Sequence, residues 1–188
     1  GRAVQLDATK SFNLSPDAVV QANTLGLGAR ELAVGASSSE ALPDGAVRVS
    51  GELLNSLNQA SQLQLRGYQG IAFHGNTQLG SASMQRLTLD TPALRGVGAK
   101  TDTATVRAQE VVLRNSTGTT LAAVAAGLST LRIEASPVLR DGRTGGLLVQ
   151  GNLANSAAQG AVGQHLGFQV GGEPFRLGAQ RRQTRLRE

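Results

Sequence analysis

Apolar and polar positions alternate along most of the chain in short runs, a pattern typical of β-strands that bury one face. Four runs share one shape: LQLR at 63–66, LTLD at 87–90, VVLR at 111–114 and LRIE at 131–134. Glycine, asparagine, aspartate or serine lies between most of the runs, and these residues allow the backbone to turn sharply. The pattern predicts an all-β chain of short strands joined by tight turns.

The runs also recur at a nearly constant interval. One series of apolar positions advances in steps of 16 to 24 residues and a second in steps of 19 to 21 residues. The first series is Leu6, Leu27, Val49, Leu65, Leu89, Leu113, Ile133 and Val149, and the second is Leu14, Val34, Leu54, Phe73 and Leu94. A repeat of about 20 residues with two or three strands each is typical of a β-solenoid, whose coils bury their apolar residues against one another. We therefore predict a β-solenoid.

An antiparallel β-sandwich is the alternative, because it also has short strands at close intervals. A sandwich is expected to carry Asn-Gly or Asp-Gly at its hairpins, and the candidates are Asp44-Gly45 and Asp141-Gly142. The chain has only four Phe and one Tyr and no Trp, whereas a sandwich usually places aromatic residues in its wider core. These observations favour the solenoid.

Two segments interrupt the alternation. Leu53, Leu54 and Leu57 have helical spacing within ELLNSLNQAS at 52–61, which predicts a short helical turn. The stretch at 152–167 is rich in alanine, glycine and asparagine and alternates weakly. We divide the chain into a shaft at 1–150, irregular or terminal coils at 151–177 and a basic flexible tail at 178–188.

A common register would give the repeated pattern a physical role. The outward residues that follow the second apolar position are Arg66, Asp90, Arg114 and Glu134, whose charges alternate in sign. Opposite charges on adjacent strands attract by about 0.2 to 1 kcal/mol per pair, so that a ladder of this kind fixes the register more than it stabilises the fold. Four unrelated solvated charges are the alternative interpretation.

The formal net charge of +5 is concentrated at the carboxyl end. The last thirteen residues contain five arginines: Arg176, Arg181, Arg182, Arg185 and Arg187. In the rest of the chain the basic and acidic residues are nearly equal in number. Guanidinium groups match the oxyanions of sulfated glycans. The tail is therefore a candidate polyanion-binding segment, with a solvated terminus as the alternative.

Few residues offer chemistry. The absence of cysteine excludes disulfides, thiolate metal sites and cysteine nucleophiles. His74 and His165 lack the spacing of metal ligands. We expect His74 to be a solvent-facing strand residue and His165 to be a loop residue. The phosphate-binding loop GxxxxGK[ST] and the nucleophile elbow GxSxG are both missing from the sequence. We predict no catalytic residue, no metal site, no cofactor and no enzymatic activity.

The segments LTLDTPALRG, ATVRAQEVVLRNSTG and TLRIEAS resemble the filamentous haemagglutinin-type exoproteins, large adhesins that Gram-negative bacteria secrete by two-partner systems. The resemblance covers residues 1–150 and rests on the style of the repeats. It implies a right-handed parallel β-helix, export through an outer-membrane transporter and a role in virulence at the cell surface. No NPNG-type secretion motif occurs, and the chain begins at Gly1, so that an interior or carboxy-terminal segment is expected.

The expected function is therefore that of a shaft that presents binding regions for attachment to host cells. A glycan- or receptor-binding module is the alternative, and a β-helical enzyme that degrades polysaccharides is a further one. Host glycans or receptors are possible partners. We expect no binding to nucleic acid and no insertion into a membrane, since no apolar run reaches the roughly 18 residues that a span needs.

Overall fold

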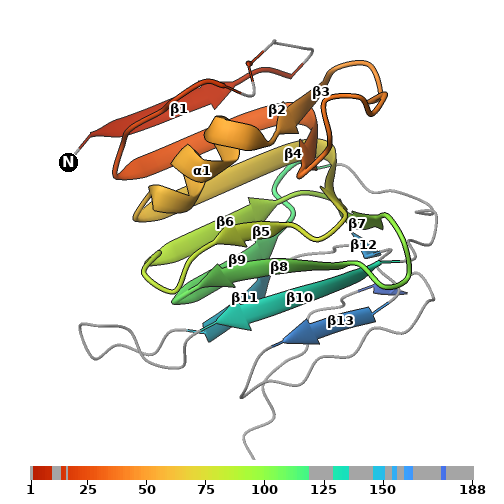
Figure 1. The fold of residues 1–188 in the computed structure, drawn as a ribbon. Helices are drawn as coiled ribbons and strands as arrows, with labels where there is room; N and C mark the ends of the chain where they lie inside the picture. The colour runs from red at the N-terminus through yellow and green to blue at the C-terminus, as the bar shows by residue number, and fades with distance from the viewer. Residues whose placement is uncertain are drawn as a thin grey trace, which may run out of the picture.

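The computed structural model describes residues 2–9, 14–15, 17–118, 129–135, 146–150, 154–155, 159–162 and 175–176 (Figure 1). The elements are β1 (Ala3–Asp7), β2 (Thr24–Val34), β3 (Ala46–Val49), α1 (Gly51–Gln59), β4 (Gln62–His74), β5 (Gln78–Gly80), β6 (Arg86–Asp90), β7 (Ala93–Val97), β8 (Thr103–Ala108), β9 (Glu110–Arg114), β10 (Thr130–Ala135), β11 (Gly146–Gln150), β12 (Ala154–Asn155), β13 (Gln159–Val162) and β14 (Phe175–Arg176).

The strands form two sheets. The larger sheet has ten strands in the order β11-β9-β6-β4-β7-β12-β14, with β2 also paired to β4 and β1 and β3 paired to β2. The smaller sheet has four strands in the order β13-β10-β8-β5. In the described part of the chain the pairs are parallel, apart from the antiparallel β12–β14 pair.

The ten-stranded sheet branches because its two long strands change neighbours along their length. The first half of β4 pairs with β6 and the second half with β7. Between β2 and β4 the register shifts, since Ala29 pairs with Gly67 and Glu31 with Gly70. An extra residue in one strand bends it at that point, and this bend separates the two halves.

Helix α1 lies beside the smaller sheet and is amphipathic. It buries Leu53 and Leu57, one turn apart, on one face. Asn58 attaches the helix to β5: its side chain donates to the carbonyl of Gln78 at 3.2 Å and accepts from the amide of Gly80 at 2.6 Å. The helical turn that we predicted at 52–61 is confirmed.

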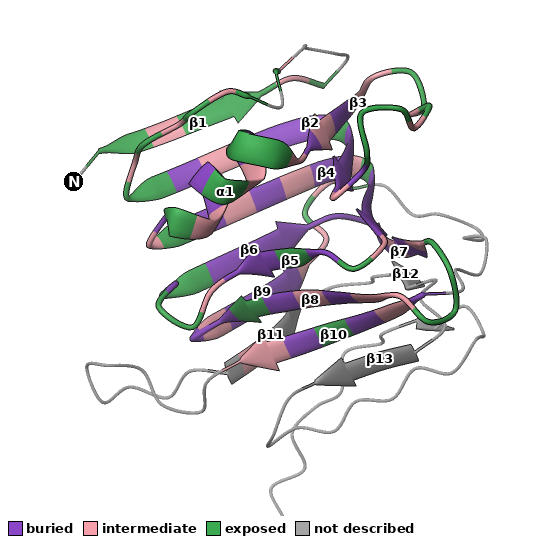
Figure 2. Cartoon of the chain, viewed as in Figure 1, coloured by how far each residue is buried: buried purple, intermediate pink, exposed green. Residues whose placement is uncertain are grey.

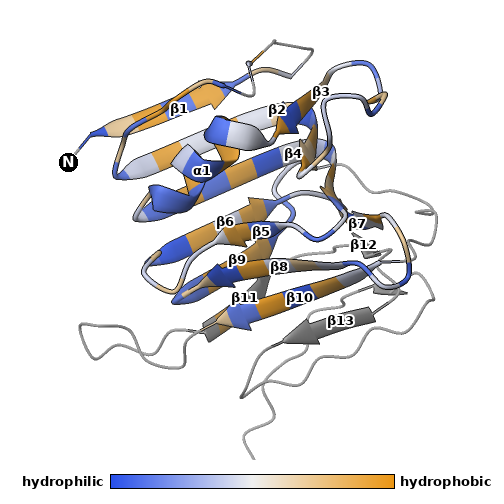
Figure 3. Cartoon of the chain, in the orientation of Figure 1, coloured by the Kyte–Doolittle hydropathy of each residue, from blue (hydrophilic) through white to orange (hydrophobic). Residues whose placement is uncertain are grey.

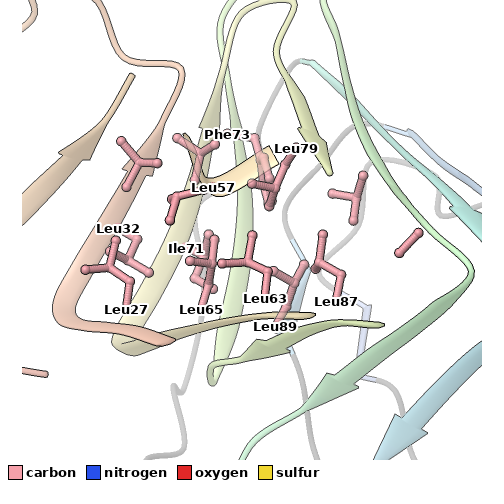
Figure 4. Close-up of a cluster of buried hydrophobic side chains, with 14 of the residues drawn as sticks. Leu27, Leu32, Leu57, Leu63, Leu65, Ile71, Phe73, Leu79, Leu87 and Leu89 are labelled. Atoms are coloured by element: carbon pink, nitrogen blue, oxygen red, sulfur yellow. The ribbon is translucent and has the colours of Figure 1, made fainter. Parts of the chain in front are cut away.

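The core consists of aliphatic residues that alternate with polar ones along β4 and β6, as the hydropathy colouring of Figure 3 shows, and Figure 2 shows buried and less buried positions alternating along the first half of β4. Leu27, Leu65 and Leu89 occupy one register row and are 3%, 0% and 0% exposed. Phe73 is fully buried in the same cluster (Figure 4). Burying one leucine contributes about 1.5 to 3 kcal/mol, so these rows supply a large part of the driving force for folding.

The predicted right-handed parallel β-helix with about 20 residues per coil is wrong. The described chain has a branched ten-stranded sheet, a second sheet of four strands and a helix, an α/β-like layout. Leu27 pairs directly with Leu65, while Val49 pairs with Val34 in a side branch. The two predicted series also fail because Leu54 is helical and Ile133 belongs to the second sheet.

The reason for the error is that alternation is a local property. It indicates that a segment forms a strand and which side chains are buried, and it carries no information on which strand lies next to it. Between β2 and β4 the chain inserts β3 and α1, which keep the apolar positions at the expected sequence intervals. Neither element adds a strand to the row in which Leu27 pairs with Leu65. Most of the predicted segments at 152–167 and 178–188 lie outside the described residues.

Candidate functional site

A row of charged residues crosses the larger sheet on the face opposite the buried leucines. The register places Asp7 of β1, Gly28 of β2, Arg66 of β4, Asp90 of β6 and Arg114 of β9 at consecutive positions. Each follows an inward leucine by one residue, so that its side chain leaves the other face of the sheet. We call these four charged residues, together with Gly28, the charged row.

Asp90 is the centre of the charged row and is fully buried. Its Oδ2 accepts hydrogen bonds from Arg114 Nε at 2.9 Å and from Arg66 Nη2 at 3.1 Å. Ser116, just after β9, donates its backbone amide to Oδ1 at 2.8 Å and its hydroxyl to Oδ2 at 2.6 Å. A buried carboxylate with two cations and two further donors is fully compensated.

These contacts determine the protonation state of Asp90. Burial alone would raise the pKa of the carboxyl group, but the hydrogen bonds from Ser116 and Arg66 and the charge of Arg114 bring that pKa below its usual value. Asp90 therefore stays ionised at neutral pH. An acid held in this state cannot serve as a proton donor, and its geometry suits the joining of β4, β6 and β9.

Asp7 extends the charged row across β2 to β1. Tyr68 donates its hydroxyl to Asp7 Oδ1 at 3.0 Å, and Arg66 Nη1 lies 3.8 Å from Asp7 Oδ2. The carboxylate lies over Gly28, where a Cβ atom would be only 2.4 Å from Asp7 Oδ1. The missing side chain at Gly28 thus allows a residue of β1 to reach residues of β4, two strands away.

The structure brings together Arg66, Asp90 and Arg114 of the predicted ladder and places Glu134 elsewhere. Glu134 lies in β10 of the smaller sheet, beside Arg107 of β8 in register. Its carboxylate is 3.3 Å from Arg107 Nε and 3.0 Å from Arg132 Nε. Asp7, Gly28, Tyr68 and Ser116 were not predicted, although Asp7 and Gly28 follow Leu6 and Leu27 of the first series by one residue, as Arg66 follows Leu65.

Other ion pairs also join neighbouring strands. Arg86 Nη2 is 2.8 Å from Glu110 Oε1 at an adjacent register position. Arg95 of β7 pairs with the buried Glu31 of β2 across β4. These pairs use charge to connect strands, as the charged row does.

The histidine that the structure describes is engaged in a buried contact. His74, at the end of β4, is 9% exposed, and its Nδ1 lies 2.8 Å from Glu40 Oε1. The expectation of a solvent-facing residue at this position is wrong, because the loop after β2 covers the side chain. His165 lies outside the described residues.

A polar pocket of about 240 Å³ lies over the same face, beside the charged row. Its lining side chains include Thr24, Gln62, Gln64, Arg86, Thr88, Val112 and Arg114. Amide, hydroxyl and guanidinium groups supply both donors and acceptors there. A second pocket, of about 470 Å³, lies between segment 20–23 and α1.

Several expectations fall on parts that the structure does not describe. Arg181, Arg182, Arg185 and Arg187 lie outside the described residues, and Arg176 belongs to β14 without a described side chain. Among the residues that are described, no three His, Cys, Asp or Glu side chains gather as a possible metal site. Within the same ranges no helix has the length and apolar character that crossing a membrane requires.

Comparisons with known proteins give no relative. No family model, no curated protein and no solved structure matches the chain. The resemblance to filamentous haemagglutinin-type exoproteins stays a prediction.

Proposed function

We propose that the chain is a non-enzymatic structural segment of a large secreted adhesin of the filamentous haemagglutinin type, which holds binding regions away from the bacterial surface. The observation that carries the proposal is the charged row, in which Asp90 joins Arg66 and Arg114 from three neighbouring strands. Side chains that connect strands laterally oppose their separation, which is the property that a segment under mechanical tension needs.

The distribution of carboxylates supports a structural role. Asp90, Glu110, Glu31 and Glu134 each pair with an arginine of a neighbouring strand or of a strand in the same sheet. Each acid is therefore neutralised by a cation instead of facing a second acid, and a catalytic acid and base pair would need two nearby carboxylates in different protonation states.

The cellular part of the proposal follows from the sequence resemblance. It consists of export through an outer-membrane two-partner secretion transporter and display at the cell surface, where host glycans or receptors would be the partners of the whole adhesin. The nearly balanced charge of the chain outside its arginine-rich end gives no reason to expect nucleic acid as a partner.

The test combines location and mechanics. In the organism that produces the chain, an antibody against it should label intact cells, and Asp90→Asn should make the surface-exposed chain more sensitive to protease. The matched control is Asp44→Asn, which changes an exposed loop residue. Labelling that requires cell lysis, or equal protease sensitivity of the Asp90 variant and the wild type, would overturn the proposal.

The polar pocket favours a second candidate, a glycan- or receptor-binding module on the sheet face. Its lining contains both hydrogen-bond donors and acceptors, which the hydroxyl groups of a neutral sugar require. Binding of the chain to a glycan array, and its loss in Gln64→Ala with unchanged stability, would support this candidate over a purely structural segment.

A further inference from the structure

The first strand of the larger sheet exposes a row of residues that the following strands bury. In the register row of Leu6, Leu27, Leu65 and Leu89, the exposed fraction falls from 36% to 3%, 0% and 0%. The residues are equivalent in type and orientation. The difference arises because Leu6 has a neighbouring strand on one side and the others have one on both sides.

The backbone of β1 has the same asymmetry. In the described part of the chain, β1 pairs with β2 and with no other strand. Figure 1 shows β1 as the outermost strand of the larger sheet, and Figure 2 shows that most of it is exposed. An edge of this kind presents hydrogen-bonding groups that can pair with another extended segment.

The segment that connects β1 to β2 widens the apolar surface at this end. Leu14 and Val20 are only partly buried where they pack against the core. Val19 is 63% exposed and, with Leu6, is one of two large apolar residues that the described chain leaves exposed. A further strand beside β1 would cover Leu6 in the way that β4 covers Leu27.

The charged row indicates which residue such a strand would carry next to Asp7. Asp90 has a cation on both sides, Arg66 on β4 and Arg114 on β9. Asp7 has Arg66 on one side only, reached over Gly28, and its side chain is 27% exposed. A lysine or arginine at the adjoining position would give Asp7 the same arrangement as Asp90.

We propose that the edge of β1 that no described strand pairs with is a docking site for a parallel β-strand of a partner chain, with aliphatic residues at its second and fourth positions and lysine or arginine at its fifth. The second and fourth positions would lie beside Val4 and Leu6, and the fifth beside Asp7. The strand QLQLR at 62–66 has this pattern and pairs with β2 in this register, with Leu63 beside Leu25, Leu65 beside Leu27 and Arg66 beside Gly28. The inference goes beyond the proposed structural function, which names no occupant for this edge.

The probe is a synthetic peptide with the sequence SQLQLRG, which copies residues 61–67, added to the full chain. Within Ala3–Asp7, hydrogen exchange of the amides that point away from β2 should slow by about tenfold at saturating peptide, because these edge amides become hydrogen-bonded. The matched peptide SQLQLDG places an acid beside Asp7 and should protect these amides far less. SQGQGRG keeps the charge and lacks the leucines, and it should give no protection.

A short strand loses conformational entropy when it binds, so a second version supplies the peptide at high effective concentration. SQLQLRG is fused ahead of the chain through a Gly/Ser linker as long as segment 8–23, which joins β1 to β2. The fusion should protect Ala3–Asp7 and raise the urea midpoint relative to the SQLQLDG fusion. If neither the free peptide nor the fusion protects these amides, the proposal is wrong. Protection that rises with protein concentration alone would assign the edge to self-association and would also overturn it.

Discussion

Arg114 donates from Nε to Asp90 Oδ2 at 2.9 Å, from the strand next to the one that carries the acid. The acid is fully buried while the guanidinium side chain is 33% exposed. The ion pair therefore lies at the boundary between the interior of the sheet and solvent. Asp90 and Arg114 each follow an inward leucine by one residue. The contribution of their ion pair can be measured as a change in the free energy of unfolding.

Asp90→Asn tests how much the charged row stabilises the fold. The substitution keeps the size of the side chain but leaves Arg66 and Arg114 without their shared anion. It also replaces one carboxylate oxygen, a hydrogen-bond acceptor, with an amide group that donates. We expect the free energy of unfolding to fall by about 2 to 4 kcal/mol. Urea denaturation followed by circular dichroism measures the change.

Asp44→Asn is the control for the loss of one negative charge, since Asp44 is exposed. Its effect should stay within about 0.5 kcal/mol. If the two substitutions changed the free energy of unfolding equally, Asp90 would affect stability only through the net charge of the chain and not through its contacts with Arg66 and Arg114.

The pH dependence of stability should identify the same carboxylate. The pKa of Asp90 in the folded chain lies below the ordinary value of 3.8, so the folded state binds the proton less tightly than the unfolded state. Its contribution is therefore complete above about pH 5 and is lost as the pH falls through the folded pKa. The stability difference between wild type and Asp90→Asn should shrink as the pH is lowered from about 5 to 2. A difference that stays constant over this range would rule out ionised Asp90 as its source.

The inward leucines allow a prediction within one register row. Leu89 is completely buried and Leu6 is 36% exposed, although they occupy equivalent positions. Leu89→Ala should destabilise the chain by about 2 to 5 kcal/mol because it removes packed methyl groups and leaves a cavity. Leu6→Ala should cost less than about 1 kcal/mol, because much of its surface is already in water. Similar losses of unfolding free energy for both would contradict the assigned burial.

The sequence was sufficient to locate many of the strands and their buried faces, although β5 and β8 were not among the predicted runs. Leu63 and Leu65, or Leu87 and Leu89, are identified by alternation, because apolar side chains at every second position of a strand lie on one face whatever strand lies beside it. Pairing between strands is a non-local property. It was predicted correctly for Leu65 and Leu89, whose strands are adjacent, and incorrectly for Val49, which lies in a side branch.

In the candidate site, too, contacts that follow the common spacing could be predicted from the sequence and others could not. The common spacing of Arg66, Asp90 and Arg114 reflects three consecutive strands of one sheet, and it placed these residues together before the structure did. Glu134 follows a run of the same shape but belongs to the other sheet. The contact of Asp7 with Tyr68 depends on the absence of a side chain at Gly28 of the intervening strand β2, and no local pattern encodes that relationship.

Gly28 offers the sharpest test of how the charged row is assembled. A Cβ atom at this position would lie 2.4 Å from Asp7 Oδ1, so Gly28→Ala should displace the carboxylate from Tyr68 and Arg66 and cost about 1 kcal/mol of stability. Gly70→Ala is the matched control in β4, where the nearest atom is 3.7 Å from the added Cβ. That variant should be neutral or more stable by up to about 1 kcal/mol, since alanine restricts the unfolded chain.

A double-mutant cycle separates two possible costs of a side chain at Gly28: displacement of the Asp7 carboxylate and steric conflict with the backbone. In an Asp7→Ala background there is no carboxylate to displace, so Gly28→Ala should lose its cost and behave like Gly70→Ala. The four free energies of unfolding from urea titrations give the coupling between the two positions. If Gly28→Ala destabilises both backgrounds equally, steric conflict with the backbone and not the displacement of Asp7 explains the glycine, and the reach of Asp7 across β2 contributes nothing to the fold.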